Sequence, residues 1–99
     1  MKIKEGAVLA GIHLHMRPVL IAADLIWKKY GQELVVTAGL DGTHSAGSLH
    51  YYGLALDFRT RYFDDITCEK VFQELDEVLG KNFDVVKHSS HIHVEYDPK

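Results

Sequence analysis

Histidine is the residue type in this 99-residue chain whose number and spacing could support chemistry. The chain has seven histidines, and five of them lie between positions 44 and 93. Imidazole nitrogens and carboxylate oxygens are common zinc ligands, and a neutral imidazole accepts a proton near pH 7. Cys68 is the only cysteine, which excludes an intrachain disulfide and an all-cysteine metal cluster. Any metal site must therefore use histidines and carboxylates.

Asp57 and the histidines of the last apolar segment form the first candidate cluster. Asp57 interrupts an otherwise apolar strand, where a carboxylate needs a cation or several hydrogen-bond donors to offset the loss of water. In the last segment His91, His93 and Glu95 share one face of a strand, because side chains alternate between faces. Pairing of these two strands would bring His93 next to Asp57.

His50 is the candidate for a third ligand. It lies seven residues before Asp57, an odd spacing that places the two side chains on opposite faces of an unbroken strand. A bend at residues 52–53, which contain a glycine, would bring both side chains to one point. His50, Asp57 and His93 would then form a zinc site whose fourth position stays open for water.

The pattern alone leaves a second interpretation equally open. In that interpretation Asp57 forms an ion pair with Arg59 or Arg61, and the histidines are ordinary residues of a polar sheet face. His13 and His15 have no ligand motif around them, so a polar strand edge is favoured over a metal site there.

The complete string over residues 48–57 is more specific than the spacing of its ligands. It reads Ser-x-His-x-x-Gly-x-Ala-x-Asp, and a His-x-His pair follows at residues 91–93. This combination resembles the zinc D-Ala-D-Ala carboxypeptidase and L-alanyl-D-glutamate endopeptidase family. The wider group includes penicillin-insensitive murein endopeptidases and the hedgehog signalling domain, and it has a small antiparallel sheet that holds one Zn²⁺. By this resemblance the metal ligands are His50, Asp57 and His93.

The same resemblance implies roles for further residues. Relatives with a His-x-His pair use the first histidine beside the metal, so His91 is the expected general base, and Glu95 on the same face is the second candidate. The expected substrate contacts are Ser48 of the motif and, apart from the resemblance, His44 in the loop, also a candidate proton donor, and Tyr52, which could line the cleft. His44 could instead be a solvated loop residue. Tyr52 could instead pack as aromatic cover.

The chain departs from the family pattern at two positions. Many carboxypeptidase-type relatives have a carboxylate three residues before the last ligand, where this chain has Ser90. Relatives often carry a substrate-anchoring arginine in a Ser-Gly-Tyr-Arg stretch, whereas residues 37–41 here read Thr-Ala-Gly-Leu-Asp. The family pattern therefore leaves both the general base and the substrate anchor to be found elsewhere.

The elements that would position these residues follow from hydrophobic periodicity and turn residues. Two helices and several short strands are expected, and Cys68 is expected in the core of the second helix. The order predicts an α+β domain: a small antiparallel sheet with two main helices mainly on one face, like the hedgehog and D-Ala-D-Ala carboxypeptidase domains. The predicted elements are an extended segment at 12–16, a helix at 18–30, a strand at 33–37, a loop at 38–48, a strand at 53–60, a helix at 66–79, and a C-terminal hairpin of strands at 83–87 and 91–96.

Composition limits the classes of partner. The length fits one zinc peptidase-like domain over residues 1–99, and the formal charge of −3 without a basic stripe argues against nucleic acid. The longest apolar stretch falls short of the roughly 20 residues that span a membrane. We expect neither a secretory signal nor a membrane anchor. We therefore expect the chain to be synthesised in the cytoplasm.

The family resemblance implies a zinc peptidase that cleaves an amide bond of the peptidoglycan stem peptide. The lack of a signal peptide and of a wall-binding module resembles a phage lysis enzyme. Such an enzyme is made in the host cytoplasm and released to the cell wall by another factor. The competing interpretation, favoured by the two departures, is a zinc-stabilised binding domain without turnover.

Overall fold

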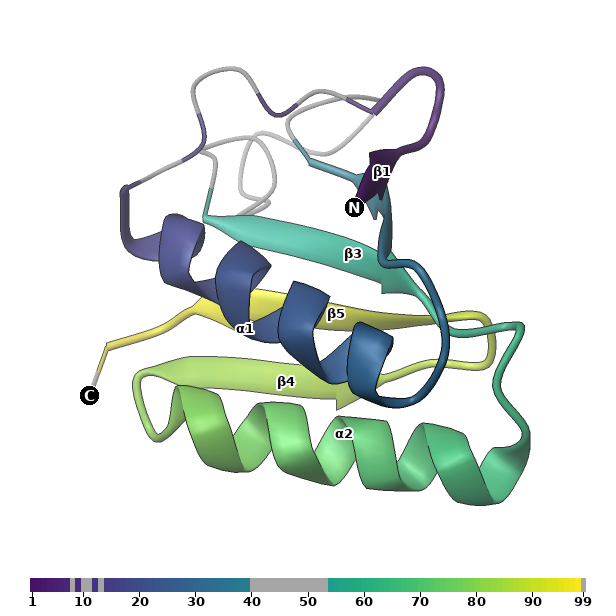
Figure 1. The fold of residues 1–99 in the computed structure, drawn as a ribbon. Helices are drawn as coiled ribbons and strands as arrows, with labels where there is room; N and C mark the ends of the chain where they lie inside the picture. The colour runs from purple at the N-terminus through teal and green to yellow at the C-terminus, as the bar shows by residue number, and fades with distance from the viewer. Residues whose placement is uncertain (8, 10–11, 13, 40–53, 99) are drawn as a thin grey trace.

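The computed structural model describes residues 1–7, 9, 12, 14–39 and 54–98 (Figure 1). Five strands form one sheet in the order β1-β2-β3-β5-β4. The pair β1–β2 is parallel and the other neighbours are antiparallel, so the sheet is mixed, whereas an antiparallel sheet was expected. The elements are β1 (Lys2–Ile3), the short 3-10 helix η1 (Leu14–Met16), α1 (Arg17–Lys29), β2 (Val35–Ala38), β3 (Ala55–Arg59), α2 (Asp65–Leu79), β4 (Phe83–Lys87) and β5 (His91–Tyr96).

Helix α1 forms close to its predicted bounds. Pro18 occupies the first turn, where its missing N–H costs no hydrogen bond. The helix ends before Gly31, whose φ of 80° lies in the left-handed region that glycine adopts without strain. The buried face carries Trp27, which is fully buried, and its indole N–H donates to the carbonyl of Arg59 at 3.0 Å. This hydrogen bond ties α1 to the end of β3.

The segment before α1 is not extended, contrary to the alternation over 12–16. Residues Leu14–Met16 form a 3-10 helix that continues directly into α1. Met16 is fully buried in the core, while Leu14 is exposed. Three apolar residues in alternation are too few to separate a strand from a helix entry, and the helix start at Arg17-Pro18 decides the conformation.

Helix α2 begins at a side-chain cap. The carboxylate of Asp64 accepts from the backbone N–H of Thr67 at 2.7 Å, and Gly80 stops the helix at its other end. Val71 and Leu75 are fully buried against the sheet. Cys68 is only half-buried, so its expected place in the core is wrong. It lies on the flank of α2 rather than on the buried face.

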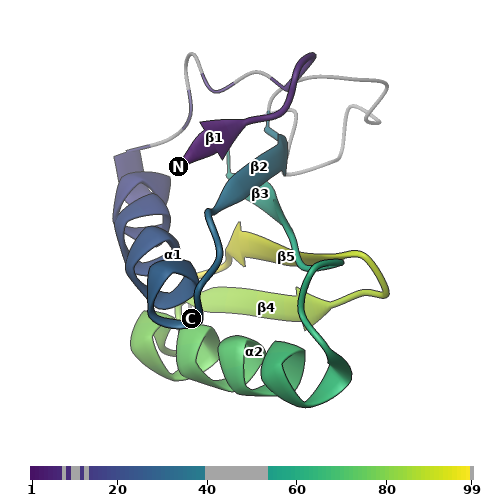
Figure 2. The same cartoon turned by 45° about the vertical axis from the view of Figure 1, so that its right-hand side comes forward.

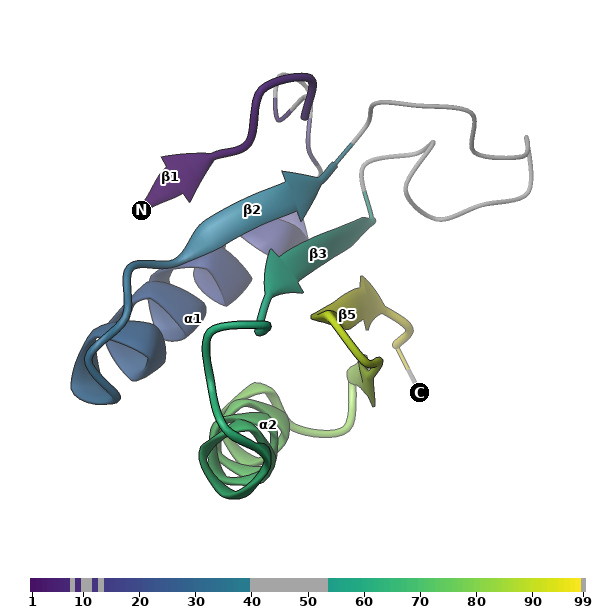
Figure 3. The same cartoon turned by 90° about the vertical axis from the view of Figure 1, so that its right-hand side faces the viewer.

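The sheet has one apolar and one polar face. Both helices cover the same side of the sheet (Figures 2 and 3), and α1 contacts α2 there. Strands β3 and β5 send alternate side chains to this side, and these are fully buried: Leu56, Phe58, Ile92 and Val94. The intervening side chains lie on the opposite face, where Ala55 is fully buried and the polar residues of both strands are half-buried. The polar residues of the candidate site therefore share the face that the helices leave uncovered.

Strand β1 is the one strand of the described sheet that the sequence analysis did not predict. The backbone N–H of Lys2 donates to the carbonyl of Leu34 at 2.7 Å, and that of Lys4 donates to the carbonyl of Val36 at 2.9 Å. Two residues carry no periodic signal, so the pairing is visible only once β2 is in place. Within the described residues, no helix is long and apolar enough to cross a membrane.

Candidate functional site

The register between β3 and β5 builds the candidate site. Asp57 lies directly opposite His93, and Arg59 lies opposite His91, in an antiparallel pair without a bulge. Cross-strand partners on one face have Cβ atoms about 4.5–5.5 Å apart, close enough for side chains to touch. The predicted approach of His93 to Asp57 is confirmed.

Asp57 and His93 are joined by a short hydrogen bond. Nδ1 of His93 donates to Oδ1 of Asp57 at 2.8 Å, and Nε2 of the same ring donates to Oε1 of Glu95 at 2.8 Å. Nε2 of His91 lies 4.0 Å from Oδ2 of Asp57. The side chains of Asp57 and His93 are 17% and 19% exposed, against 33% for His91. The first two form the interior of the cluster, and His91 borders solvent.

Electrostatics favour a proton on the His93 ring. The hydrogen bond to Asp57 raises the pKa of His93, Glu95 acts in the same direction, and burial opposes both. A ring that donates from both nitrogens is an imidazolium. A metal binds imidazole only after the coordinating nitrogen has lost its proton, so metal binding here competes with protonation.

The contact between His93 and Glu95 was not predicted. Glu95 was expected as a second candidate for a general base, and the structure instead shows it holding the ring of His93. The two residues are two positions apart on one strand. This spacing predicts that their side chains share a face, but it does not predict that they touch. A carboxylate that accepts from the far nitrogen of a histidine fixes the ring orientation and raises its basicity.

The donor chemistry at Asp57 and His93 suits zinc. Two donors of one tetrahedral zinc ion, each at roughly 2.0–2.2 Å, lie about 3.3–3.5 Å apart. The observed 2.8 Å between the two donor atoms needs only a small opening to reach that separation. Across the described ranges, no group of three or more His, Cys, Asp or Glu side chains is arranged to hold a metal ion. The third expected ligand, His50, lies outside those ranges.

His91 has neighbours on both sides of its ring. Its Nδ1 lies 3.3 Å from the hydroxyl oxygen of Ser90, and its ring stacks on that of His88 with centroids 4.7 Å apart. Ser90, the residue at the position of the family's carboxylate, is exposed at the hairpin turn. The hydroxyl can orient the imidazole of His91 but does not replace a carboxylate as a base.

A pocket of about 260 Å³ adjoins the cluster on the same face of the sheet. Its lining includes Asp57 and His91 of the cluster together with Lys4, Arg59 and Arg61. No ion pair joins Asp57 to either arginine, all three of which are described residues, so the alternative with such a pair is wrong. Lys4 was missed because its place depends on β1.

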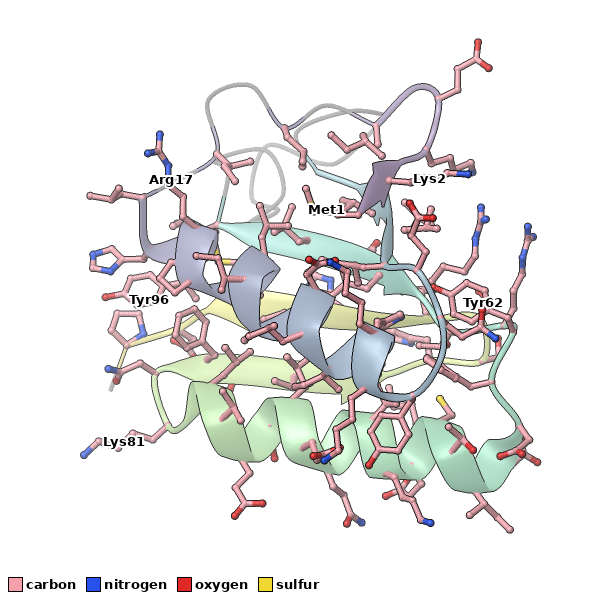
Figure 4. The ribbon with its side chains drawn as sticks, viewed as in Figure 1. Met1, Lys2, Arg17, Tyr62, Lys81 and Tyr96 are labelled. Atoms are coloured by element: carbon pink, nitrogen blue, oxygen red, sulfur yellow. The ribbon has the colours of Figure 1, made fainter. Side chains whose placement is uncertain are left out.

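Several predicted site residues lie outside the described part of the chain. These are the ligand His50 and the expected substrate contacts His44, Ser48 and Tyr52, together with His13. His15 is described, and its ring stacks on that of Tyr96, with centroids 4.4 Å apart and planes 7° apart. Figure 4 shows Tyr96 and Tyr62 toward opposite ends of the sheet, so this stacking lies at the far end from Tyr62.

Comparison with protein-family models gave no match for this chain, and no curated protein matched it either. The candidate site therefore rests on the sequence motifs and on the geometry of β3 and β5.

Proposed function

We propose that this chain is a zinc peptidase that hydrolyses an amide bond of the peptidoglycan stem peptide. The family resemblance points to a D-Ala-D-Ala carboxypeptidase or an L-Ala-D-Glu endopeptidase, with a hedgehog-like fold. The observation that carries the proposal is the Asp57–His93 pair, with its 2.8 Å contact on the face that no helix covers. The resemblance makes these two residues ligands, and His50 the third.

In the proposed reaction, the metal and the protein side chains would make different contributions. When bound, zinc supplies a Lewis acid that polarises a carbonyl and makes water more acidic. Asp57 supplies a negatively charged oxygen, which needs little rearrangement because the strand register already places it beside His93. Glu95 holds the ring of His93 from its other side. The β3–β5 pair thus preorganises two of the three proposed ligands.

His91 is the proposed general base. It borders solvent, lines the adjoining pocket and lies 4.0 Å from Asp57, so it can take a proton from water that enters from the pocket. The hydroxyl of Ser90 orients its other nitrogen. After the proton transfer, the imidazolium of His91 would stabilise negative charge that develops on the substrate carbonyl oxygen.

The biological setting proposed with this activity is cell-wall lysis by a phage enzyme. The resemblance to the peptidoglycan peptidases is what supports it. The partner is then the stem peptide.

Incubation with purified peptidoglycan tests the proposal. The zinc-loaded chain is expected to release D-alanine or to create new amino termini, and a chelator should abolish both. A chain that binds zinc and releases neither product would contradict the peptidase assignment. That result would favour the alternative, a zinc-stabilised binding domain without turnover, which is supported by Ser90 at the position where relatives have a carboxylate.

A further inference from the structure

The β4–β5 hairpin brings two histidine rings together beside the candidate site. Strand β4 ends at Lys87 opposite Ile92, and His88 and His91 continue this register by one position. The backbone N–H of His88 donates to the carbonyl of His91 at 2.8 Å, which closes the hairpin across the two serines of the turn. Because cross-strand partners share one face of a sheet, both rings lie on the polar face with Asp57.

The rings of His88 and His91 are stacked. Their centroids are 4.7 Å apart and their planes differ by 27°, a separation within the range of about 4.5–7 Å that offset aromatic pairs adopt. The torsion that turns a histidine ring has only a broad preference, so neighbouring groups decide where the ring nitrogens point. A ring that covers one face of His91 therefore limits the rotation of its imidazole.

Polar contacts restrain His91 less than they restrain His93. Both nitrogens of His93 make hydrogen bonds of 2.8 Å. Nδ1 of His91 lies 3.3 Å from the hydroxyl of Ser90, slightly beyond the roughly 2.7–3.2 Å of an ordinary N–H···O bond. Its Nε2 lies 4.0 Å from Oδ2 of Asp57, which is out of hydrogen-bond reach. The stacked ring of His88 therefore supplies a restraint that these polar contacts do not.

The orientation of His91 decides whether it can act as a base. A general base must reach its proton at hydrogen-bond distance, and a displacement of about 1 Å can cost about 10²-fold in rate. His91 lines the pocket of about 260 Å³ together with Asp57, whereas His88 and Lys87 line a different cavity of about 290 Å³. His88 thus contacts the proposed base from a cavity other than the one that the base faces.

We infer that His88 is a positioning residue, whose ring holds the imidazole of His91 in the orientation that proton transfer requires. The inference rests on the proposed function and deepens it, because it assigns a role to a residue outside the two motifs that carry the family resemblance. The stack needs a flat ring at position 88 rather than its nitrogens. Another aromatic side chain should therefore restrain His91 equally well.

Two substitutions at His88 test the inference with a soluble stem-type peptide and the zinc-loaded chain. His88→Ala removes the ring, so kcat should fall about 10-fold while KM changes less than about twofold, because the base is misplaced and substrate still binds. His88→Phe keeps a flat ring without titratable nitrogens, so kcat should stay within about threefold of the unmodified chain. An unchanged kcat in His88→Ala, or an equal loss in His88→Phe, would overturn the inference.

His15→Ala is the matched control. It removes another stacked histidine ring, which contacts Tyr96 at the opposite end of β5 from His91, so kcat should not change. The double variant of His88→Ala and His91→Ala is the second check, because a residue that acts only through His91 causes no further loss once His91 is absent. A loss in His15→Ala equal to that in His88→Ala, or a further loss of about 10-fold in the double variant, would contradict the positioning role.

A measurement without substrate separates failure of this inference from failure of the proposed function. NMR relaxation of the ring carbons of His91 gives the order parameter of its imidazole in the unmodified chain and in both His88 variants. The order parameter should fall in His88→Ala and be kept in His88→Phe, even in a chain that hydrolyses nothing. Equal ring order in all three proteins would overturn the inference. Absence of hydrolysis with the ring still restrained by position 88 would contradict the proposed function alone.

Discussion

Asp57 is a charged residue whose two neighbours along β3, Leu56 and Phe58, are fully buried apolar residues. Its side chain turns to the uncovered face, where the ring of His93 compensates its charge at 2.8 Å. The same contact places an anionic oxygen and an imidazole nitrogen close enough to share one cation.

Zinc affinity should respond differently to the two carboxylates of the cluster. Asp57→Asn removes a negatively charged ligand oxygen, whereas Glu95→Gln only weakens the orientation of His93, an outer contact whose loss typically costs about 10- to 100-fold. Asp57→Asn should therefore cost the larger factor in a competitive zinc titration. Equal zinc affinity in the two variants would count against Asp57 as a ligand.

His91→Ala separates proton transfer from metal binding. As a proton-transfer residue, His91 can be lost without loss of zinc, while kcat falls by about 10²- to 10⁴-fold. Metal content and peptidoglycan hydrolysis, both measured on the same preparation, check this. Loss of zinc from the variant would instead indicate a closed site with four protein ligands, as structural zinc sites have.

Side-chain alternation predicted the core of the candidate site but not its surroundings. The shared face of His91, His93 and Glu95, and the approach to Asp57, follow from the period of two along a strand. The contact of Glu95 with His93 depends on rotamers, which the sequence pattern does not specify. Lys4 lines the adjoining pocket and follows a two-residue strand. Hydrophobic periodicity cannot reveal so short a strand, so this part of the lining could not be predicted.

Among the elements, β5 and the adjacent β4 show the difference between the core face and the polar face of the sheet. Val94 is fully buried against the helices, whereas Val86 on the adjacent β4 is 43% exposed on the polar face beside His93. Val94→Ala should therefore lower the free energy of unfolding by about 1.5–3 kcal/mol, and Val86→Ala by less than about 1 kcal/mol. Urea unfolding of both variants checks this, and equal losses would contradict the assignment of the two faces.

The cap of α2 should make stability depend on pH. Hydrogen bonds from Thr67 lower the pKa of Asp64 below its ordinary value of 3.8. A carboxylate with a depressed pKa stabilises the folded state above its unfolded pKa, and this contribution disappears as pH falls through the folded value. Asp64→Ala should thus reduce the urea midpoint at pH 7, and the difference from the unmodified chain should shrink below pH 3.8. A difference that stays constant over this range would rule out the charged cap.

Elements with long periodic patterns were predicted well. Both helices begin and end within a residue of their predicted bounds, and β4 and β5 match theirs, because caps and alternation mark them. The extended segment at 12–16 was wrong, since three alternating residues cannot outweigh the helix entry that follows. The parallel pairing of β1 was missed because it depends on contact with β2 rather than on local sequence.

At the scale of the whole molecule, the fold separates the apolar core from the polar residues of the candidate site. The helices and the apolar sheet face form one core around Trp27 and Phe58, whose rings meet edge to face with centroids 5.8 Å apart. The opposite face holds Asp57, His91, His93 and Glu95 and the pocket that adjoins them. Substitutions there can change binding with little effect on the core.

The proposed ligands come from points far apart in the sequence, and two of them already meet through the β3–β5 register. Zinc binding as proposed should therefore stabilise the folded chain over the unfolded chain, which holds no preformed site. Both the proposed hydrolysis and the alternative binding role require that metal. The zinc content of the chain is thus the most direct test of the account.

That measurement is the zinc stoichiometry of the purified chain after reconstitution and removal of free metal. The account predicts one zinc ion per chain, with the stoichiometry lost in His93→Ala and kept in His88→Ala, whose ring belongs to an exposed residue of the hairpin turn. A stoichiometry near zero in the unmodified chain, or an equal one in both variants, would contradict it.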